Sequence, residues 1–170
     1  MDSTEQTLLK AAQRRPVVLR DVVASLELGA LRKLLADLPA DRWAPGDRTT
    51  HSWQECLLQP EEESAVNSIS PAISRFTALA SRTAAWVNSF GAGEWIGKHR
   101  DVDGDAQLII PLNVPSFEQG GYLWVNARKT VILVQAGDLL VFNASVLPHG
   151  TTSILAPDAR RVTLNIRLWQ

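Results

Sequence analysis

The sequence has few of the residues that cross-link a chain or bind metals through sulfur. Cys56 is the only cysteine among 170 residues, which excludes an intramolecular disulfide and any cysteine-based zinc or iron–sulfur site. Histidine is also scarce, at three residues. A single cysteine fits a reducing compartment, so we expect a cytoplasmic location.

An excess of one charge and a long apolar run are both lacking. The 17 Lys and Arg residues balance 18 Asp and Glu, for a net charge of −1, so no overall positive field attracts nucleic acid or an anionic membrane. No segment reaches the length of a membrane span, and residues 1–16 lack the apolar centre of a signal peptide. We therefore expect neither nucleic acid nor membrane partners; the sequence leaves the oligomeric state open.

Length and composition suit one domain over residues 1–170. With 45% hydrophobic and 21% charged residues, the chain can bury one core but is short for two. No repeat or low-complexity linker divides it. We expect residues 1–82 to form helical support and a substrate lid, and residues 83–170 to form a β-rich core.

The first part of the chain predicts three helices. Ser25 stands at an N-cap position before leucines with near-helical spacing, which predicts a helix through Leu38 that Pro39 closes. Pro60 and three following glutamates begin a second helical region, because acidic residues favour a first turn. The third helix covers about residues 71–81. Short extended segments are expected at 16–19 and 52–59.

From residue 83 onward, short β-rich runs alternate with glycine, proline and asparagine. Eight strands are expected, over residues 84–90, 96–102, 107–114, 121–125, 130–134, 138–142, 149–154 and 161–169. Eight short strands with short turns suggest a double-sheet jelly roll. The predicted fold class is mostly β with flanking helices (α+β), in which the N-terminal helices brace one sheet.

The sequence His99-Arg100-Asp101, followed by His149, offers two imidazoles and one carboxylate as metal ligands. Residues i and i+2 of a strand point the same way, so His99 and Asp101 can reach inward together, while His149 must come from a distant strand. Such a set leaves open positions on an octahedral metal, which suits iron(II) that must also bind a co-substrate and O₂. A bare His-x-Asp also occurs by chance, so neighbouring motifs must support it.

The last predicted strand has one polar face and one apolar face. Arg161, Thr163, Asn165 and Arg167 alternate with Val162, Leu164, Ile166 and Leu168. A buried dicarboxylate favours charge-assisted guanidinium contacts of this kind. A solvated edge strand could carry the same charges, but the position of this strand after His149 favours ligand binding.

Residues 84–169 resemble the double-stranded β-helix core of iron(II)/2-oxoglutarate-dependent dioxygenases, with some features of the AlkB-type branch. The motifs follow the family's order: Asn88-Ser89-Phe90 with Gly91 and Gly93, His99-Arg100-Asp101, Pro111-Leu112-Asn113, Phe117 to Leu123 with its Gly120-Gly121 turn, Gly137 to Phe142 followed by His149-Gly150, and Arg161 to Arg167. The resemblance implies a jelly-roll catalytic core over residues 83–170, with His99, Asp101 and His149 as iron(II) ligands.

The resemblance also implies how 2-oxoglutarate is held. Arg161 would pair with the carboxylate remote from the metal, Thr163 would assist, and Arg167 matches a second arginine that contacts the same co-substrate. Asn88 would hydrogen-bond the co-substrate, or else is a polar residue that ends a strand. Arg160 has the opposite parity and is the second choice for the anchor.

The activity implied is that of an oxygenase that uses O₂, releases succinate and CO₂, and hydroxylates its substrate. About 80 residues before the core leave room for a lid but not for a large recognition domain, so we expect a small substrate: an amino acid or a natural-product intermediate. Candidates for substrate contact are Trp95, four residues before His99; Trp53, at the cleft rim; and His51, in a loop.

Three alternatives stay open at this point. One is an AlkB-like oxidative demethylase of nucleic acid. A second is a cupin-like metalloprotein that uses the same ligands without 2-oxoglutarate. The third is a non-catalytic β-sandwich binding module in which the histidines are incidental.

Overall fold

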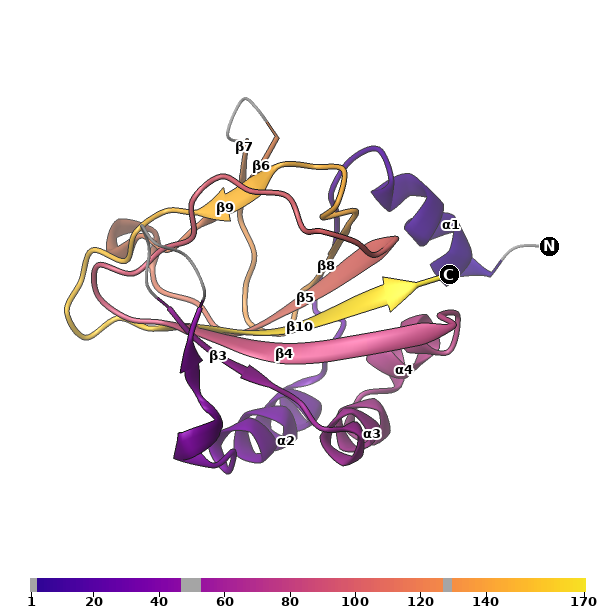
Figure 1. Cartoon of the computed structure of the whole chain (residues 1–170), viewed down its shortest axis with the longest axis horizontal. Helices are drawn as coiled ribbons and strands as arrows, with labels where there is room; N and C mark the ends of the chain where they lie inside the picture. Colours follow the sequence, from indigo (N-terminus) through magenta and orange to yellow (C-terminus); the bar gives the residue numbers. More distant parts are fainter. Residues whose placement is uncertain (1–2, 47–52, 127–129) are drawn as a thin grey trace.

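Two antiparallel sheets face each other, and helices cover the outer face of the larger one (Figure 1). The computed structural model describes residues 3–46, 53–126 and 130–170. The larger sheet has the order β1-β8-β5-β10-β4-β3-β2, and the smaller one β7-β6-β9. The fold is the mostly β jelly roll with flanking helices that the sequence predicted.

The strands are short except for three in the centre of the larger sheet. Their bounds are β1 Val17–Leu19, β2 Ala44–Pro45, β3 Gln54–Leu57, β4 Arg82–Phe90, β5 Ala106–Asn113, β6 Leu123–Val125, β7 Thr130–Ile132, β8 Leu139–Phe142, β9 His149–Thr151 and β10 Arg161–Trp169. The long strand β10 lies between β5 and β4 and pairs with both. Strands β1, β2 and β3 show that residues 1–82 contribute strands to this sheet as well as helices.

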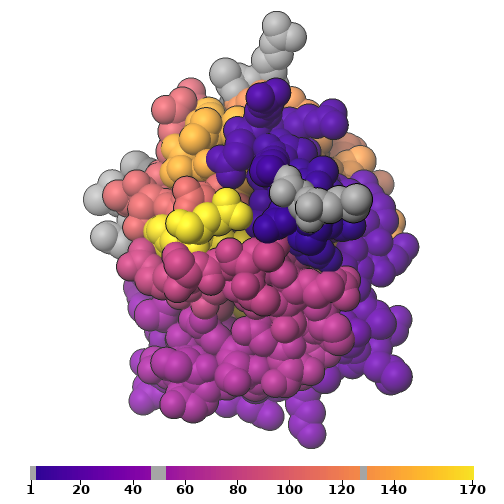
Figure 2. Space-filling model, turned by 90° about the vertical axis from the view of Figure 1, so that its right-hand side faces the viewer, coloured from indigo at the N-terminus to yellow at the C-terminus, as the bar shows by residue number. Residues whose placement is uncertain are grey.

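The helices are α1 Thr4–Ala12, α2 Ser25–Ala36, α3 Pro60–Ile69 and α4 Pro71–Thr77, with 3-10 turns at Ala40–Arg42 and Phe117–Gln119. In Figure 1, α2, α3 and α4 lie under the larger sheet and α1 lies beside β8. In the face shown in Figure 2, the end of β10 (yellow) lies between α1 (indigo) and the α4–β4 region (magenta). No described helix is long and apolar enough to cross a membrane.

Helix α2 follows the leucine spacing that predicted it, with Leu28, Leu31 and Leu35 buried. The predicted cap is wrong: Ser25 is the first helical residue, and Ala24 occupies the N-cap position without a side-chain hydrogen bond. Helix α1 was not predicted. Its signal is a capping box, in which Ser3 and Gln6 bond each other's backbone N–H groups.

The main core lies between the helices and the larger sheet. On β10, Leu164, Ile166 and Leu168 are buried in it, together with Val87 of β4 and Leu108 of β5. Because side chains alternate along a strand, the other face of the same strands points towards the smaller sheet. Burial of the apolar face thus sets which residues line the space between the sheets.

The predicted strand over residues 96–102 is wrong, since this segment is a loop that touches β9 at isolated points. His99 and His149 exchange backbone hydrogen bonds of 3.0 and 2.9 Å, but the Asp101 N–H turns away to the carbonyl of Ala144. Lys98 and Arg100 are exposed while His99 and Asp101 are partly buried. The loop therefore shows the alternation of a strand without a continuous ladder.

Candidate metal centre

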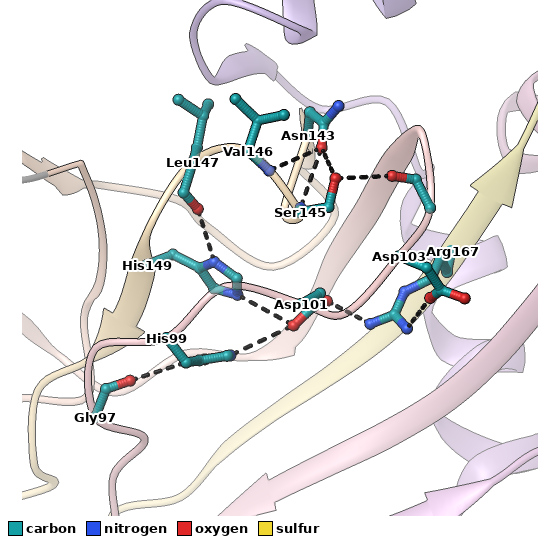
Figure 3. Close-up of polar contacts among 11 residues, drawn as sticks. Gly97, His99, Asp101, Asp103, Asn143, Ser145, Val146, Leu147, His149 and Arg167 are labelled. Atoms are coloured by element: carbon teal, nitrogen blue, oxygen red, sulfur yellow. Dashed lines mark hydrogen bonds and ion pairs between the residues drawn. The ribbon is translucent and has the colours of Figure 1, made fainter.

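The three predicted ligands converge between the two sheets (Figure 3). Asp101 Oδ1 lies 3.5 Å from His99 Nε2 and 3.8 Å from His149 Nε2. One ligand atom from each residue lies within 4.8 Å of the other two, and no other group of three such residues occurs in the described ranges. The structure thus brings together the three residues that the sequence grouped as ligands, although two of them lie on a loop rather than on the predicted strand.

Backbone carbonyls orient both imidazoles. His99 Nδ1 lies 2.8 Å from the carbonyl oxygen of Gly97, and His149 Nδ1 lies 3.0 Å from that of Leu147. Because a carbonyl only accepts, each Nδ1 donates, and the remaining nitrogen of each ring, Nε2, faces Asp101, where its lone pair can bind a metal ion. Two nitrogen lone pairs and a carboxylate oxygen that face one another are the donor set of a divalent metal ion.

The protonation states of His149 and Asp101 also favour the binding of a metal ion. Burial, followed by the neighbouring His99, lowers the pKa of His149 to about 4, and Asp101 offsets only part of this decrease. Burial alone would raise the pKa of Asp101, but His99, His149 and Arg167 hold it at about 2. At neutral pH His149 is therefore neutral and Asp101 is ionised, which is the state that binds a metal.

Arg167 contacts the other oxygen of the ligand carboxylate. Its Nη2 donates to Asp101 Oδ2, and its Nη1 donates to Asp103 Oδ1 at 3.0 Å. The side chain comes from β10 and reaches the loop that carries Asp101 (Figure 3). The guanidinium thus fixes the orientation of the carboxylate and leaves Oδ1 towards the imidazoles.

A turn between β8 and β9 supports the loop from the other side. Asn143 Oδ1 accepts hydrogen bonds from the N–H groups of Ser145 and Val146, and the Ser145 hydroxyl donates to the carbonyl of Gly104 at 3.1 Å. This turn also supplies Ala144 O for Asp101 N–H. The backbone before β9 therefore holds the loop that carries two ligands and positions the third.

The metal ligands lie in a cavity of about 400 Å³ whose floor is the polar face of β10. Arg161, Thr163, Asn165 and Arg167 all line it. Since β10 is a central strand, its charges do not belong to a solvated edge. Across the β10–β4 pairing, Thr163 is opposite Asn88 and Arg161 is opposite Phe90.

Arg161 is the least paired cation of the cavity. Its side chain is buried, with 3% of its surface exposed. Among the described residues, Nη1 donates a hydrogen bond to the carbonyl of Gly121 at 3.1 Å. Burial lowers the pKa of Arg161 to about 10, so it stays charged at neutral pH. A buried guanidinium without a carboxylate partner is suited to an anionic ligand. Arg160, by contrast, is exposed and does not line the cavity.

Two buried amides have free acceptor atoms in the same cavity. Asn88 Oδ1 and Gln107 Oε1 have no hydrogen-bond partner among the described residues. Thr163 Oγ1 accepts from Asn165 Nδ2 at 3.3 Å, so its own proton is free to donate. Buried polar atoms of this kind are usually satisfied by a ligand or water.

The three residues expected to contact the substrate differ in their position relative to the cavity. Trp53 lines the cavity and is buried. Trp95 is 37% exposed and is not among the lining residues. His51 lies outside the described residues. Sequence reasoning missed Glu55, which lines the cavity from β3; the signal was its position next to buried Cys56 on an alternating strand. Trp86 of β4, which the sequence suggested as a packing or cleft-rim residue, also lines the cavity.

Comparison with known proteins shows which fold class the chain has. No model of a protein family matches the sequence, and none of the curated proteins matches it. Solved structures do match over nearly the whole chain, and they include a prolyl-4-hydroxylase, a member of the 2OG-Fe(II) oxygenase family and a non-heme α-ketoglutarate-dependent epimerase. The chain therefore shares the fold of these enzymes.

Three solved structures illustrate the similarity. A prolyl-4-hydroxylase from Pseudomonas putida is 17% identical, with a TM-score of 0.73 over 98% of this chain and 99% of that chain. An oxidoreductase of the 2OG-Fe(II) oxygenase family from Burkholderia pseudomallei is 19% identical, with a TM-score of 0.73 over 98% and 91%. The non-heme α-ketoglutarate-dependent epimerase SnoN from nogalamycin biosynthesis is 14% identical, with a TM-score of 0.69 over 99% and 84%.

Proposed function

We propose that the protein is an iron(II)- and 2-oxoglutarate-dependent oxygenase that hydroxylates a small molecule. The observation that carries the proposal is that the His99–Asp101–His149 set shares one cavity with the guanidinium of Arg161, which has no carboxylate partner among the described residues. A cupin-like metal site would need the three ligands but not a buried arginine beside them. A non-catalytic module would need neither the ligand set nor the arginine. The likeness in fold to oxygenases supports the same assignment.

The donor set fits iron(II). A set of two imidazoles and one carboxylate is typical of iron(II) sites that keep positions open for a co-substrate and O₂. Bound there, the iron would couple O₂ reduction and the oxidative decarboxylation of 2-oxoglutarate, to succinate and CO₂, with hydroxylation of a C–H bond. The protein itself orients the ligands through Gly97, Leu147 and Arg167.

The polar face of β10 would bind the co-substrate. Arg161 would receive the carboxylate remote from the metal through its free N–H groups, and the Thr163 hydroxyl would donate to the same group. Asn88 lies opposite Thr163, and its free amide can reach a ligand in the cavity. Arg167 already binds Asp101 and Asp103, so a contact to the co-substrate would add to that role.

A cavity of about 400 Å³ is near the lower end of ligand sites in proteins, which supports a compact substrate beside the co-substrate. We propose residues 83–170 as the catalytic core and residues 1–82 as its support and lid. Strand β3 supports the lid role, because Trp53, Glu55 and Leu57 line the cavity. The expected cytoplasmic location remains a prediction.

The proposal is tested by succinate formation from 2-oxoglutarate under O₂, with and without iron(II). We expect turnover that needs all three, that rises with a substrate from a panel of small molecules, and that is lost in Asp101→Ala. A product heavier by one oxygen atom supports hydroxylation, whereas unchanged mass with inverted stereochemistry supports epimerisation. Unaltered turnover in Asp101→Ala would remove Asp101 from the ligand set.

A further inference from the structure

Glu55 is an acidic residue of the cavity that the proposed reaction does not use. It lies on β3 directly opposite Asn88 of β4, which in turn lies opposite Thr163 of β10. All three side chains line the cavity. Glu55 therefore belongs to the same row as the proposed co-substrate residues, at the end of the row farthest from β10.

The charge of Glu55 has no counterion among the described residues. It forms no ion pair with a described residue. Its Oε2 accepts one long hydrogen bond, of 3.3 Å, from Trp53 Nε1. The described lining residues contain one other carboxylate, Asp101, and two cations, Arg161 and Arg167. Arg167 is bound to Asp101 and Asp103.

Neither lining cation is placed as a counterion of Glu55. Arg167 donates to Asp101 and Asp103, and Arg161 is the proposed partner of the 2-oxoglutarate carboxylate remote from the metal. Among the described residues, the Glu55 carboxylate is therefore left without an ion-pair partner in contact with it.

The surroundings of Glu55 suit a cation with an apolar stem. Trp86 and Leu57 form a neighbouring pair across the same two strands, and Trp53 is stacked at 6.4 Å from Phe90. Indole faces attract ammonium and guanidinium groups. The free Asn88 Oδ1 is a further acceptor beside Glu55, and a carboxylate co-substrate has no proton to offer it.

We propose that the substrate carries a positively charged ammonium or guanidinium group, which Glu55 binds at the part of the cavity that Trp53 and Trp86 also line. This inference rests on the proposed function for the pairing of the other charges. It narrows the substrate class to small cationic amines or guanidines. Glu55 then acts in substrate selection and takes no part in metal or co-substrate binding.

The test compares matched charged and neutral probes: butylguanidinium with butylurea, and pentylammonium with pentanol. Binding is followed through the indole N–H resonances of Trp53 and Trp86 by NMR, on the protein with zinc(II) as a diamagnetic metal and 2-oxoglutarate. The variants are Glu55→Gln, which keeps an acceptor for Trp53, and Glu61→Gln, which removes the same charge from an exposed position on α3.

We expect each cation to bind wild type and Glu61→Gln about tenfold more tightly than its neutral partner, the factor for one charge-assisted hydrogen bond. Glu55→Gln should bring this ratio to about one. Equal affinities in wild type, or a preference that survives in Glu55→Gln, overturn the inference. Glu55→Ser is measured as well, so that an unstable Gln variant does not decide the result.

Binding of zinc(II) and 2-oxoglutarate is measured separately by calorimetry on the same samples. If neither binds while the cation preference still depends on Glu55, the proposed oxygenase function fails and the cation site stands. If both bind and the preference is missing, the cation site fails and the proposed function stands.

Discussion

Arg167 binds Asp101 Oδ2, while Asp101 Oδ1 faces both imidazoles. Oδ2 thus binds the guanidinium, and Oδ1 stays available to a metal ion. Because Arg167 lies on β10 and Asp101 on a loop, this ion pair links the loop to the sheet. We therefore infer that Arg167 positions Asp101 as a metal ligand.

Replacing Arg167 with Gln should weaken binding of manganese(II), a stable substitute for iron(II), by about 10- to 100-fold, the usual effect of losing a group that orients a metal ligand. The measurement is calorimetry without 2-oxoglutarate. Arg82→Gln is the matched control, because Arg82 lies 3.9 Å from Asp103 but makes no contact with Asp101. Unchanged metal affinity with weaker 2-oxoglutarate binding would assign Arg167 to the co-substrate instead.

Arg161→Gln should raise the KM for 2-oxoglutarate, or its Kd in the presence of metal, by about 10- to 100-fold, because a charge-assisted contact contributes about 1.5 to 3 kcal/mol. Metal affinity without 2-oxoglutarate should stay unchanged. Arg160→Gln removes the same charge from the exposed residue just before β10 and should have no effect. A larger effect from Arg160→Gln than from Arg161→Gln would reverse the choice of anchor.

Gly150→Ala should displace the backbone that orients His99 in the candidate metal site. A Cβ at Gly150 would lie 2.6 Å from Trp124 Cζ2, 2.7 Å from Ile96 O and 2.9 Å from Gly97 O. Since the Gly97 carbonyl orients His99, we expect weaker metal binding and a lower Tm. Gly29→Ala, on the exposed side of α2 with nothing within 4 Å, should stabilise by about 0.5–1 kcal/mol. Wild-type metal affinity in Gly150→Ala would contradict this account of the loop.

Acid should destabilise the metal-free protein through His149. Its pKa is about 4 in the folded protein and about 6.5 when unfolded. Between these values the unfolded chain binds a proton that the native state excludes, so the free energy of unfolding falls as the pH is lowered. The loss should be on the order of 2 kcal/mol between about pH 7 and pH 5.

This loss is measured by urea denaturation in the presence of a chelator. His149→Gln cannot take up the proton, so its stability should change much less over the same pH range. Parallel losses in wild type and His149→Gln would show that another group is responsible.

The fold and the proximity of the three candidate ligands were predictable because their signals are local. Alternation along residues 161–169 gave both faces of β10, and the only His-x-Asp with a later histidine gave the candidate ligand set. The capping box of α1 was equally local and was overlooked. The strand predicted at residues 96–102 failed because exposed Lys98 and Arg100 mimic strand alternation in a loop that β9 holds at single points.

The contacts that complete the site depend on register and could not be predicted. The Asp101–Arg167 pair joins a loop to a strand 66 residues away. The Glu55–Asn88–Thr163 row exists because β3, β4 and β10 are neighbours in one particular alignment. Neither relationship leaves a pattern in the sequence itself.

The visible spectrum of the protein with iron(II) and 2-oxoglutarate, recorded without oxygen, tests the central claim most directly. If His99, Asp101 and His149 hold iron beside a co-substrate anchored by Arg161, a charge-transfer band should appear in wild type when both are added. The band should need both components and be absent from Asp101→Ala. A folded wild-type protein that gives no band, at concentrations where iron(II) is bound, would contradict the account.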